Sequence, residues 1–285
     1  MSKITISIDN TSDLTPDIVN RWGFKVVHFG VVIGDKVYSD SEVRSEDIYD
    51  AVENKAIIPK TNAALEVDYR ELFEKETANG GSIIHFNLSG GLSASHENAK
   101  RAAKGLDRVY VIDSRTVSVG TAYLAILARR MVDEGKMSAK EIADKVNDLT
   151  DCIDTSVILK DLKYVHLGGR VSGLKLFGAN LLKIRPSLYC DNNGKFVQAK
   201  KFKGDFAKCV QEWTQYKIAQ NVESNKDLVF IAHTQTDDGI LQGMVKDLKS
   251  AGFQEVIVLE TGTVLTTHCG KNMLGMVFYT GNKGE

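Results

Sequence analysis

The sequence SIIHFNLSGGLSASHENA spans residues 82–99 and joins an apolar run, a turn rich in serine and glycine, and an amphipathic helical pattern. A buried strand that leads directly into a helix is the repeating unit of a parallel α/β sheet. The free N–H groups at the start of such a helix attract a carboxylate or phosphate. Ser89, Ser93 and Ser95 add hydroxyl donors beside them. The stretch therefore predicts an α/β fold and an anion-binding turn within it.

The same alternation of apolar runs and helical patterns extends over the first half of the chain. The expected strand and helix pairs are residues 4–8 with 16–22, 26–33 with 45–53, 83–88 with 93–105, and 109–112 with 121–133. Helix-start signals support this pattern, because Thr15 precedes Pro16, and Ser138 with Glu141 forms a capping-box sequence. We therefore expect a mostly parallel sheet with helices on both faces.

The second half of the chain predicts a separate α/β domain with a mixed sheet. A strand-like run at residues 156–159 is followed by two more, 184–190 and 196–199, around Asn193-Gly194, which is a hairpin signal. Alternating helices and strands follow at residues 205–219, 228–232, 237–251 and 256–259. The prediction is thus two domains, residues 1–154 with a parallel sheet and residues 155–285 with a mixed one.

The composition excludes several functional classes. The chain has 285 residues and a formal net charge of −1 at pH 7, without the basic stripe of a nucleic-acid-binding protein. No apolar run approaches the roughly 20 residues needed to span a bilayer, and the first residues lack the apolar core of a signal peptide. We therefore expect a cytoplasmic protein that binds no nucleic acid and makes only transient contact with membranes.

Neither a metal nor a nucleotide cofactor is expected. The four cysteines are scattered without C-x-x-C spacing, which argues against structural zinc and against a disulfide framework. The histidines show no metal-ligand spacing, and no glycine-rich phosphate-binding motif follows a strand. The chain should therefore not be a self-sufficient kinase or dehydrogenase.

Further polar turns are expected to converge on the turn at residues 88–95. Pro59-Lys60-Thr61, Leu167-Gly168-Gly169-Arg170 and Thr266-Thr267-His268-Cys269-Gly270 each place polar side chains beside an apolar run. Asp9 and Asp113 follow strand-like runs, and ligands of open parallel sheets bind beyond the carboxyl ends of the strands. Gly168 and Gly169 suggest a flexible loop before the fixed positive charge of Arg170.

Each candidate residue also has an ordinary structural interpretation. Asp9 and the pair Asp113-Ser114 are typical of turns and helix caps. Ser93 can serve only as a helix N-cap, and Arg170 can be a surface residue after a C-capping glycine. His268 can be a hydrogen-bonded structural histidine.

An enzymatic alternative comes from the sequence Gly91-Leu92-Ser93-Ala94-Ser95. It lies between a strand and a helix, as does the nucleophile elbow of an α/β-hydrolase. Ser93, a later aspartate and His268 follow the triad order of that fold, although Ser95 replaces the second glycine of the elbow. A serine esterase that uses Ser93 and His268 is therefore the competing hypothesis.

Seven short motifs occur in an order that resembles the DegV family of bacterial fatty-acid-binding proteins. They are residues 9–14, 59–61, 91–93, 111–114, 167–170 and 183–188, together with His268. The chain departs from the family pattern beside these motifs, at residues 62–64, 94–96 and 269–272. Because the polar residues of the motifs are kept, the departures concern ligand preference more than the existence of a site.

This resemblance implies a carrier, not an enzyme, that buries a long-chain fatty acid and presents its carboxylate to a separate kinase. Thr61 and Ser93 would hold the carboxyl group, His268 would complete the network, and Arg170 would lie at the mouth. The kinase subunit would bring ATP and Mg²⁺, and the acyl phosphate would serve phospholipid synthesis. The implied ligand-binding residues are Thr61, Gly91, Leu92, Ser93, Arg170 and His268, supported by Asp9, Asp113 and Ser114.

Overall fold

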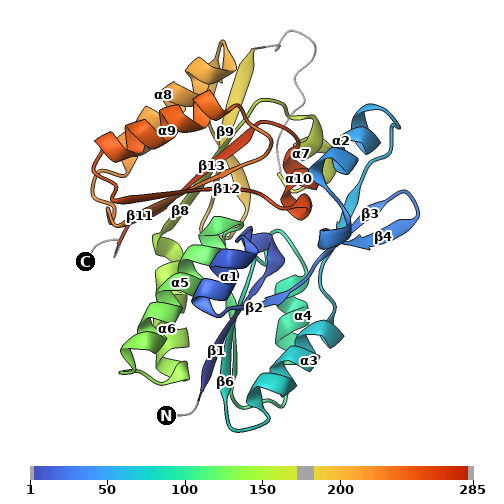
Figure 1. The fold of residues 1–285 in the computed structure, drawn as a ribbon, viewed down its shortest axis with the longest axis vertical. Coiled ribbons are helices and arrows are strands. Elements are labelled where there is room, and N and C mark those ends of the chain that lie inside the picture. The colour runs from blue at the N-terminus through green and yellow to red at the C-terminus, as the bar shows by residue number, and fades with distance from the viewer. Residues whose placement is uncertain (1–2, 172–182, 282–285) are drawn as a thin grey trace.

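Figure 1 shows the computed structural model, which describes residues 3–171 and 183–281. The chain forms two α/β domains, the lower one in this view built on a parallel sheet and the upper one on a mixed sheet. The predicted fold class is therefore confirmed. The domain boundary that the sequence predicts, after residue 154, stays a prediction.

Four parallel strands form the first sheet in the order β2, β1, β6, β7. They are β1 (Ile4–Asp9), β2 (Lys25–Val27), β6 (Ser82–Asn87) and β7 (Val109–Asp113). All residues of β6 are buried, as expected for a strand covered on both faces. Since Ile8 lies opposite Phe86, the carboxyl ends of β1 and β6 are neighbours.

Helices cover both faces of this sheet (Figure 1). They are α1 (Pro16–Trp22), α3 (Glu66–Thr77), α4 (Ser95–Ala102), α5 (Val119–Glu134) and α6 (Ala139–Leu149). Ile84 and Phe86 pack toward α5 and α6, whereas Ile83 packs toward α3 and α4. The capping box before α6 is confirmed, because the N–H of Glu141 donates to Ser138 Oγ at 3.3 Å and Glu141 accepts from the N–H of Ser138.

The second sheet has the order β10, β9, β8, β13, β11, β12, and only β11 and β12 are parallel. Its strands are β8 (Ile153–Leu159), β9 (Ile184–Cys190), β10 (Phe196–Lys203), β11 (Leu228–His233), β12 (Glu255–Glu260) and β13 (Met273–Tyr279). Helices α8 (Phe206–Gln220) and α9 (Asp238–Ser250) pack on one face. The predicted hairpin is confirmed as β9 and β10. The sequence did not predict β13.

A small antiparallel sheet, which the sequence did not predict, lies beside the junction of the two domains. It contains β3 (Gly30–Ile33), β4 (Lys36–Ser39) and β5 (Lys60–Asn62), and α2 (Ser45–Glu53) lies between β4 and β5 in the chain. The single strand expected at residues 26–33 is therefore wrong, because the chain leaves the parallel sheet after β2 and turns. The N–H of Phe29 donates to Asn10 Oδ1 at 3.0 Å at this turn.

Two short helices at the junction replace two expected turns. They are α7 (Lys163–Gly168) and α10 (Thr263–Cys269), which pack against each other, and α10 also packs against α2. Gly169, at φ 65°, ends α7 in the left-handed conformation, as the C-cap interpretation predicts. In α10 the Thr267 hydroxyl donates to the carbonyl of Thr263, so β-branched residues are accommodated in a helix.

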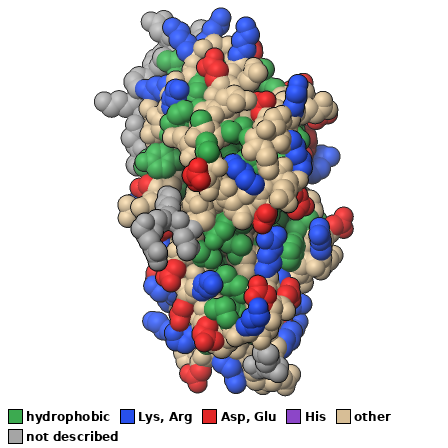
Figure 2. All heavy atoms as spheres, turned by 90° about the vertical axis from the view of Figure 1, so that its left-hand side faces the viewer, with side chains coloured by type: hydrophobic (Ala, Val, Ile, Leu, Met, Phe, Trp, Pro, Cys, Tyr) green, Lys and Arg blue, Asp and Glu red, His purple; other side chains and the backbone are tan. Residues whose placement is uncertain are grey.

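The surface in Figure 2 carries positive and negative side chains interspersed over the face it shows. This is the distribution expected from a net charge of −1 with acidic and basic residues mixed along the chain. Within residues 3–171 and 183–281, none of the helices is both long and apolar enough to cross a bilayer.

Candidate functional site

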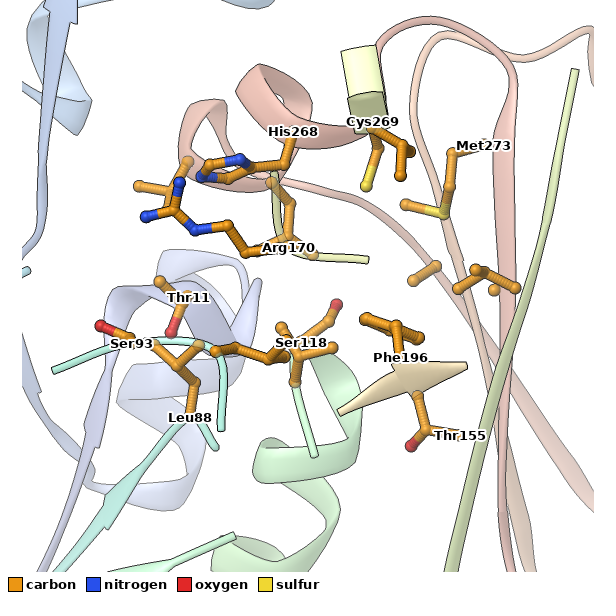
Figure 3. Close-up of a pocket in the computed structure, with 18 of the residues that line it drawn as sticks. Thr11, Leu88, Ser93, Ser118, Thr155, Arg170, Phe196, His268, Cys269 and Met273 are labelled. Atoms are coloured by element: carbon orange, nitrogen blue, oxygen red, sulfur yellow. The ribbon is translucent and has the colours of Figure 1, made fainter. Parts of the chain in front are cut away.

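A cavity of about 360 Å³ lies between the two domains, and its walls are mostly apolar. Residues of both domains line it, and most of their side chains are apolar. Figure 3 shows Ser93, Arg170 and His268 at one end of the cavity, whereas Phe196 and Met273 lie toward the other end. Such a cavity suits a ligand with a long apolar part and one polar head.

Thr61 and His268 meet at the polar end. Thr61 lies on β5 and His268 on α10, and Thr61 Oγ1 is 2.9 Å from His268 Nε2. Burial and, to a smaller extent, the positive charge of Arg170 lower the pKa of His268 from 6.5 to about 4, so the ring is neutral at pH 7. The histidine therefore contributes hydrogen bonds and no charge.

The surroundings of His268 Nδ1 decide which nitrogen carries the proton. Nδ1 is buried and has no hydrogen-bond partner among the described residues, and it lies so close to Gly168 that a Cβ there would be 2.5 Å away. A buried N–H without an acceptor is rare in proteins, so the proton belongs on Nε2. His268 then donates to Thr61 Oγ1, and the hydroxyl hydrogen of Thr61 is left for an acceptor in the cavity.

Ser93 stands just before α4, which begins at Ser95 and not at Ser93 as the sequence predicted. Its Oγ accepts a hydrogen bond from the N–H of Ser95 at 3.2 Å, and its own N–H donates to the carbonyl of Ser89. The hydroxyl hydrogen of Ser93 therefore stays available to a ligand. The start of α4 lies directly behind it, where the helix dipole favours a negative group.

Arg170 lines the cavity and is also exposed to solvent. One guanidinium nitrogen, Nη1, donates to the carbonyl of Gly168 at 2.7 Å, which anchors the side chain at the end of α7. The motif therefore combines the two expected features. Gly169 caps the C-terminus of α7, and Arg170 lies where the cavity opens to solvent. The remaining guanidinium donors can reach a carboxylate.

The two remaining predicted ligand residues differ in position. Leu92 lines the cavity, whereas Gly91 does not. A Cβ on Gly91 would lie 2.7 Å from the carbonyl oxygen of Asn193 and 2.9 Å from that of Gly194. Gly91 therefore allows the turn after β6 to touch the β9–β10 hairpin of the other domain.

Asp9 supports the turn after β6 without lining the cavity. It is fully buried and accepts hydrogen bonds from Tyr69 Oη at 2.8 Å, from Asn87 Nδ2 at 3.1 Å and from the N–H of Leu88 at 3.1 Å. The end of β1 is thereby tied to the end of β6. His85 Nε2 is 3.3 Å from the same carboxylate.

Asp113 and Ser114 also lie outside the cavity lining and organise the neighbouring turns. Asp113 Oδ1 accepts from the N–H of Gly90 at 3.1 Å and from the N–H of Arg115 at 3.0 Å. Ser114 is buried and its Oγ is 3.0 Å from Thr121 Oγ1. Both residues therefore stabilise turns, as their structural interpretation predicts. Through its hydrogen bond from Gly90, Asp113 also supports the turn that carries Ser93.

Asp13 and Ser118 form a polar cluster that the sequence did not predict. Asp13 is buried, accepts from the Ser118 hydroxyl, and accepts from the N–H of Gly262 at 2.8 Å. Burial raises the pKa of Asp13 from 3.8 to about 7. Ser118 lines the cavity. Nothing in the sequence links these residues, because Gly262 is 249 positions from Asp13.

The geometry does not favour the esterase alternative. Among the described residues, His268 Nε2 is bonded to Thr61 and not to Ser93, and no carboxylate bonds to Nδ1. A serine hydrolase needs its histidine beside the nucleophile and an acidic residue behind the histidine. The described residues also contain no group of three or more His, Cys, Asp or Glu arranged to hold a metal.

Comparisons with known proteins give one family. The family model described as "Uncharacterised protein, DegV family" matches residues 3–281. A Streptococcus pneumoniae "DegV domain-containing protein" is 25% identical over 95% of this chain and 96% of its own length. A Thermotoga maritima "Fatty acid-binding protein" is 26% identical over 96% of each chain.

Solved structures share the fold. A fatty-acid-binding DegV family protein from Thermus thermophilus matches with a TM-score of 0.88 at 24% identity, over 97% of this chain and 99% of its own. A stearic-acid-binding protein from Eubacterium ventriosum matches with a TM-score of 0.84 at 20% identity, over 98% and 99%. Because the family model matches nearly the whole of this chain, the chain is a member of the DegV family.

Proposed function

We propose that this protein binds a long-chain fatty acid and presents its carboxylate to a separate kinase, which forms the acyl phosphate. The observation that carries the proposal is the interdomain cavity, whose apolar walls end in Thr61, Ser93, Arg170 and His268. Its volume of about 360 Å³ is within the range of sites that enclose small ligands. The names of the Thermotoga and Thermus relatives support the same ligand class.

The alkyl chain supplies most of the binding free energy. At about 0.8 kcal/mol per buried CH₂ group, a chain of about 16 carbons contributes on the order of 10 kcal/mol before ordering costs. The head-group contacts therefore need only orient the carboxylate. This fits a cavity with a mostly apolar lining whose charged and imidazole side chains, Arg170 and His268, lie at one end.

The head group would be held by neutral donors and one cation. The hydroxyls of Thr61 and Ser93 point their free hydrogens to the carboxylate, and His268 orients Thr61. Arg170 supplies the positive charge from the solvent side. An ionised carboxylate is thereby satisfied by hydrogen bonds, as a buried charge requires.

Phosphorylation would take place at the mouth. A carboxylate oxygen attacks the terminal phosphorus of ATP, a new P–O bond forms, and ADP leaves. The chain has no phosphate-binding loop motif for ATP, so a kinase partner would supply the nucleotide and Mg²⁺. Arg170 would meet the added phosphoryl charge. The acyl phosphate would then pass to phospholipid synthesis in the cytoplasm, with only transient membrane contact.

The proposal is tested by mass spectrometry of the purified protein, first in its native state and then after organic extraction. We expect one non-covalent fatty acid per chain, released intact on denaturation. An empty protein, or an acyl group attached covalently to Ser93, would contradict the proposal and restore the esterase hypothesis. Incubation with ATP and a bacterial fatty acid kinase should convert the bound acid to its acyl phosphate.

A further inference from the structure

The parallel sheet reverses its strand order between β1 and β6, because β2 lies on one side of β1 and β6 on the other. In open α/β sheets the loops after the two strands at such a reversal diverge and form a ligand-binding crevice. Here these loops are residues 10–13 and residues 88–93. The second loop carries Ser93, so the first loop is positioned to supply a matching contact.

Thr11 is the residue of the first loop that lines the cavity. Thr11 is 1% exposed, and within residues 3–171 and 183–281 its buried hydroxyl oxygen has no hydrogen-bond partner. The neighbouring polar groups differ: Asn10 Oδ1 accepts from Phe29, and Asp13 accepts from two donors. The Ser12 hydroxyl also has no partner in the described part of the chain, but Ser12 does not line the cavity. Thr11 alone in this loop combines an unpaired hydroxyl with the cavity wall.

The position of Thr11 indicates what its hydroxyl would bind. Figure 3 places it at the same end of the cavity as Ser93 and Arg170. Asp9, the last residue of β1, holds the two loops together through its hydrogen bond from the N–H of Leu88. The group that reaches this end must be an acceptor, because the guanidinium of Arg170 can only donate.

We propose that Thr11 is a further head-group residue whose hydroxyl donates a hydrogen bond to a carboxylate oxygen of the bound fatty acid. This inference rests on the proposed function. A carboxylate offers about four acceptor positions on its two oxygens, so the donors from Thr61, Ser93 and Arg170 leave room for one more. The buried hydroxyl of Thr11, which has no hydrogen-bond partner among the described residues, would then gain one.

The test uses palmitate labelled with ¹³C at the carboxyl carbon, whose NMR resonance reports hydrogen bonding to the head group. Thr11→Val keeps the shape of the side chain and removes the hydroxyl, and Thr11→Ser restores the hydroxyl. Ser12→Ala is the matched control, since it removes an equally unpaired hydroxyl from the same loop outside the cavity lining. Affinity for palmitate is measured in parallel by calorimetry.

We expect Thr11→Val to lower the affinity for palmitate roughly tenfold, as for one lost hydrogen bond to a charged group, and to shift the bound carboxyl resonance. Thr11→Ser should recover both values, and Ser12→Ala should leave both unchanged. If Thr11→Val does not fold, Thr11→Ala takes its place. Wild-type affinity and an unshifted resonance would overturn the role of Thr11. A wild-type protein that gives no bound resonance would instead overturn the proposed function itself.

Discussion

The side chains at the polar end of the cavity offer hydrogen-bond donors that can bind a ligand. Most of these donors are neutral. His268 is neutral because burial lowers its pKa to about 4, and it passes its hydrogen bond on through Thr61. Ser93 receives a hydrogen bond from the backbone and keeps its own hydrogen. Arg170 supplies charge from an exposed position. Retention and reaction of the head group can therefore be separated by mutation.

Ser93→Ala should weaken retention of the fatty acid while leaving the fold intact. The variant loses one hydrogen bond to a charged group, so we expect palmitate affinity to fall by roughly tenfold, measured by calorimetry. Circular dichroism should match the wild type, because α4 begins after this residue. Wild-type lipid occupancy together with normal acyl phosphate formation would show that Ser93 has no part in the site.

Arg170→Ala should separate binding from phosphorylation. Because the side chain is exposed, water and salt screen its contact with the carboxylate, and we expect nearly normal fatty-acid binding, with a smaller loss than in Ser93→Ala. Acyl phosphate formation with a partner kinase should fall by at least roughly tenfold, as for a lost charge-assisted contact to the phosphoryl group. Arg170→Lys, which keeps the charge, serves as the comparison. An unaltered phosphorylation rate in Arg170→Ala removes this residue from the proposed mechanism.

At the level of elements, α10 determines where His268 lies. It begins after Gly262 and ends at Gly270, whose φ of 66° and ψ of −163° lie in a region essentially reserved for glycine. A Cβ on Gly270 would come within 2.3 Å of the Tyr164 ring of α7. The close packing of these two helices therefore depends on a glycine at this position.

Gly270→Ala should destabilise the protein strongly. Both the backbone conformation and the contact with Tyr164 oppose a side chain, and we expect a loss of about 3 kcal/mol in the free energy of unfolding. Gly252→Ala is the matched control, because Gly252 has a positive φ of 92° and open space around it. It should cost about 1 kcal/mol. Urea denaturation measures both values, and equal losses would show that contact with Tyr164 is unimportant.

At the scale of the whole molecule, Asp13 joins segments from both domains. It belongs to the loop after β1 and accepts hydrogen bonds from Ser118 at the start of α5 and from Gly262 at the start of α10. Burial raises its pKa from 3.8 to about 7, so the folded protein binds a proton here more tightly than the unfolded chain. The stability of the domain junction should therefore depend on pH.

Wild-type stability relative to Asp13→Asn should fall as the pH rises from 5 to 7. Because the folded pKa is the higher one, the stabilising effect of protonation is present at low pH and is lost as the pH passes through about 7. The expected change is roughly 2 kcal/mol. The lowered pKa of His268 opposes this trend, but it is present in both proteins and cancels. Urea denaturation of both proteins at each pH measures this difference. A difference in the free energy of unfolding that stays constant from pH 5 to 7 would contradict the role of Asp13.

The prediction of secondary structure was wrong where tertiary packing overrides the local sequence pattern. The apolar run at residues 26–33 reads as one strand, yet β2 pairs with β1 while β3 pairs with β4 and β5. The capped helices were predicted correctly, because Pro16 and the box of Ser138 and Glu141 are local signals. The hydrogen bonds of a helix cap depend on neighbouring residues, whereas the choice of strand partner depends on residues far away in the chain.

The sequence by itself determined the α/β class, most capped helices and the hairpin, and it pointed to Thr61, Ser93, Arg170 and His268, which line one cavity. These follow from periodicity, capping chemistry and motifs whose parts are close in the chain. Only the tertiary structure decided that Thr61 meets His268, that Gly91 touches the opposite domain, and that Asp13 bonds to Gly262. Such contacts join residues far apart in the chain, and they exist only after both sheets have packed together.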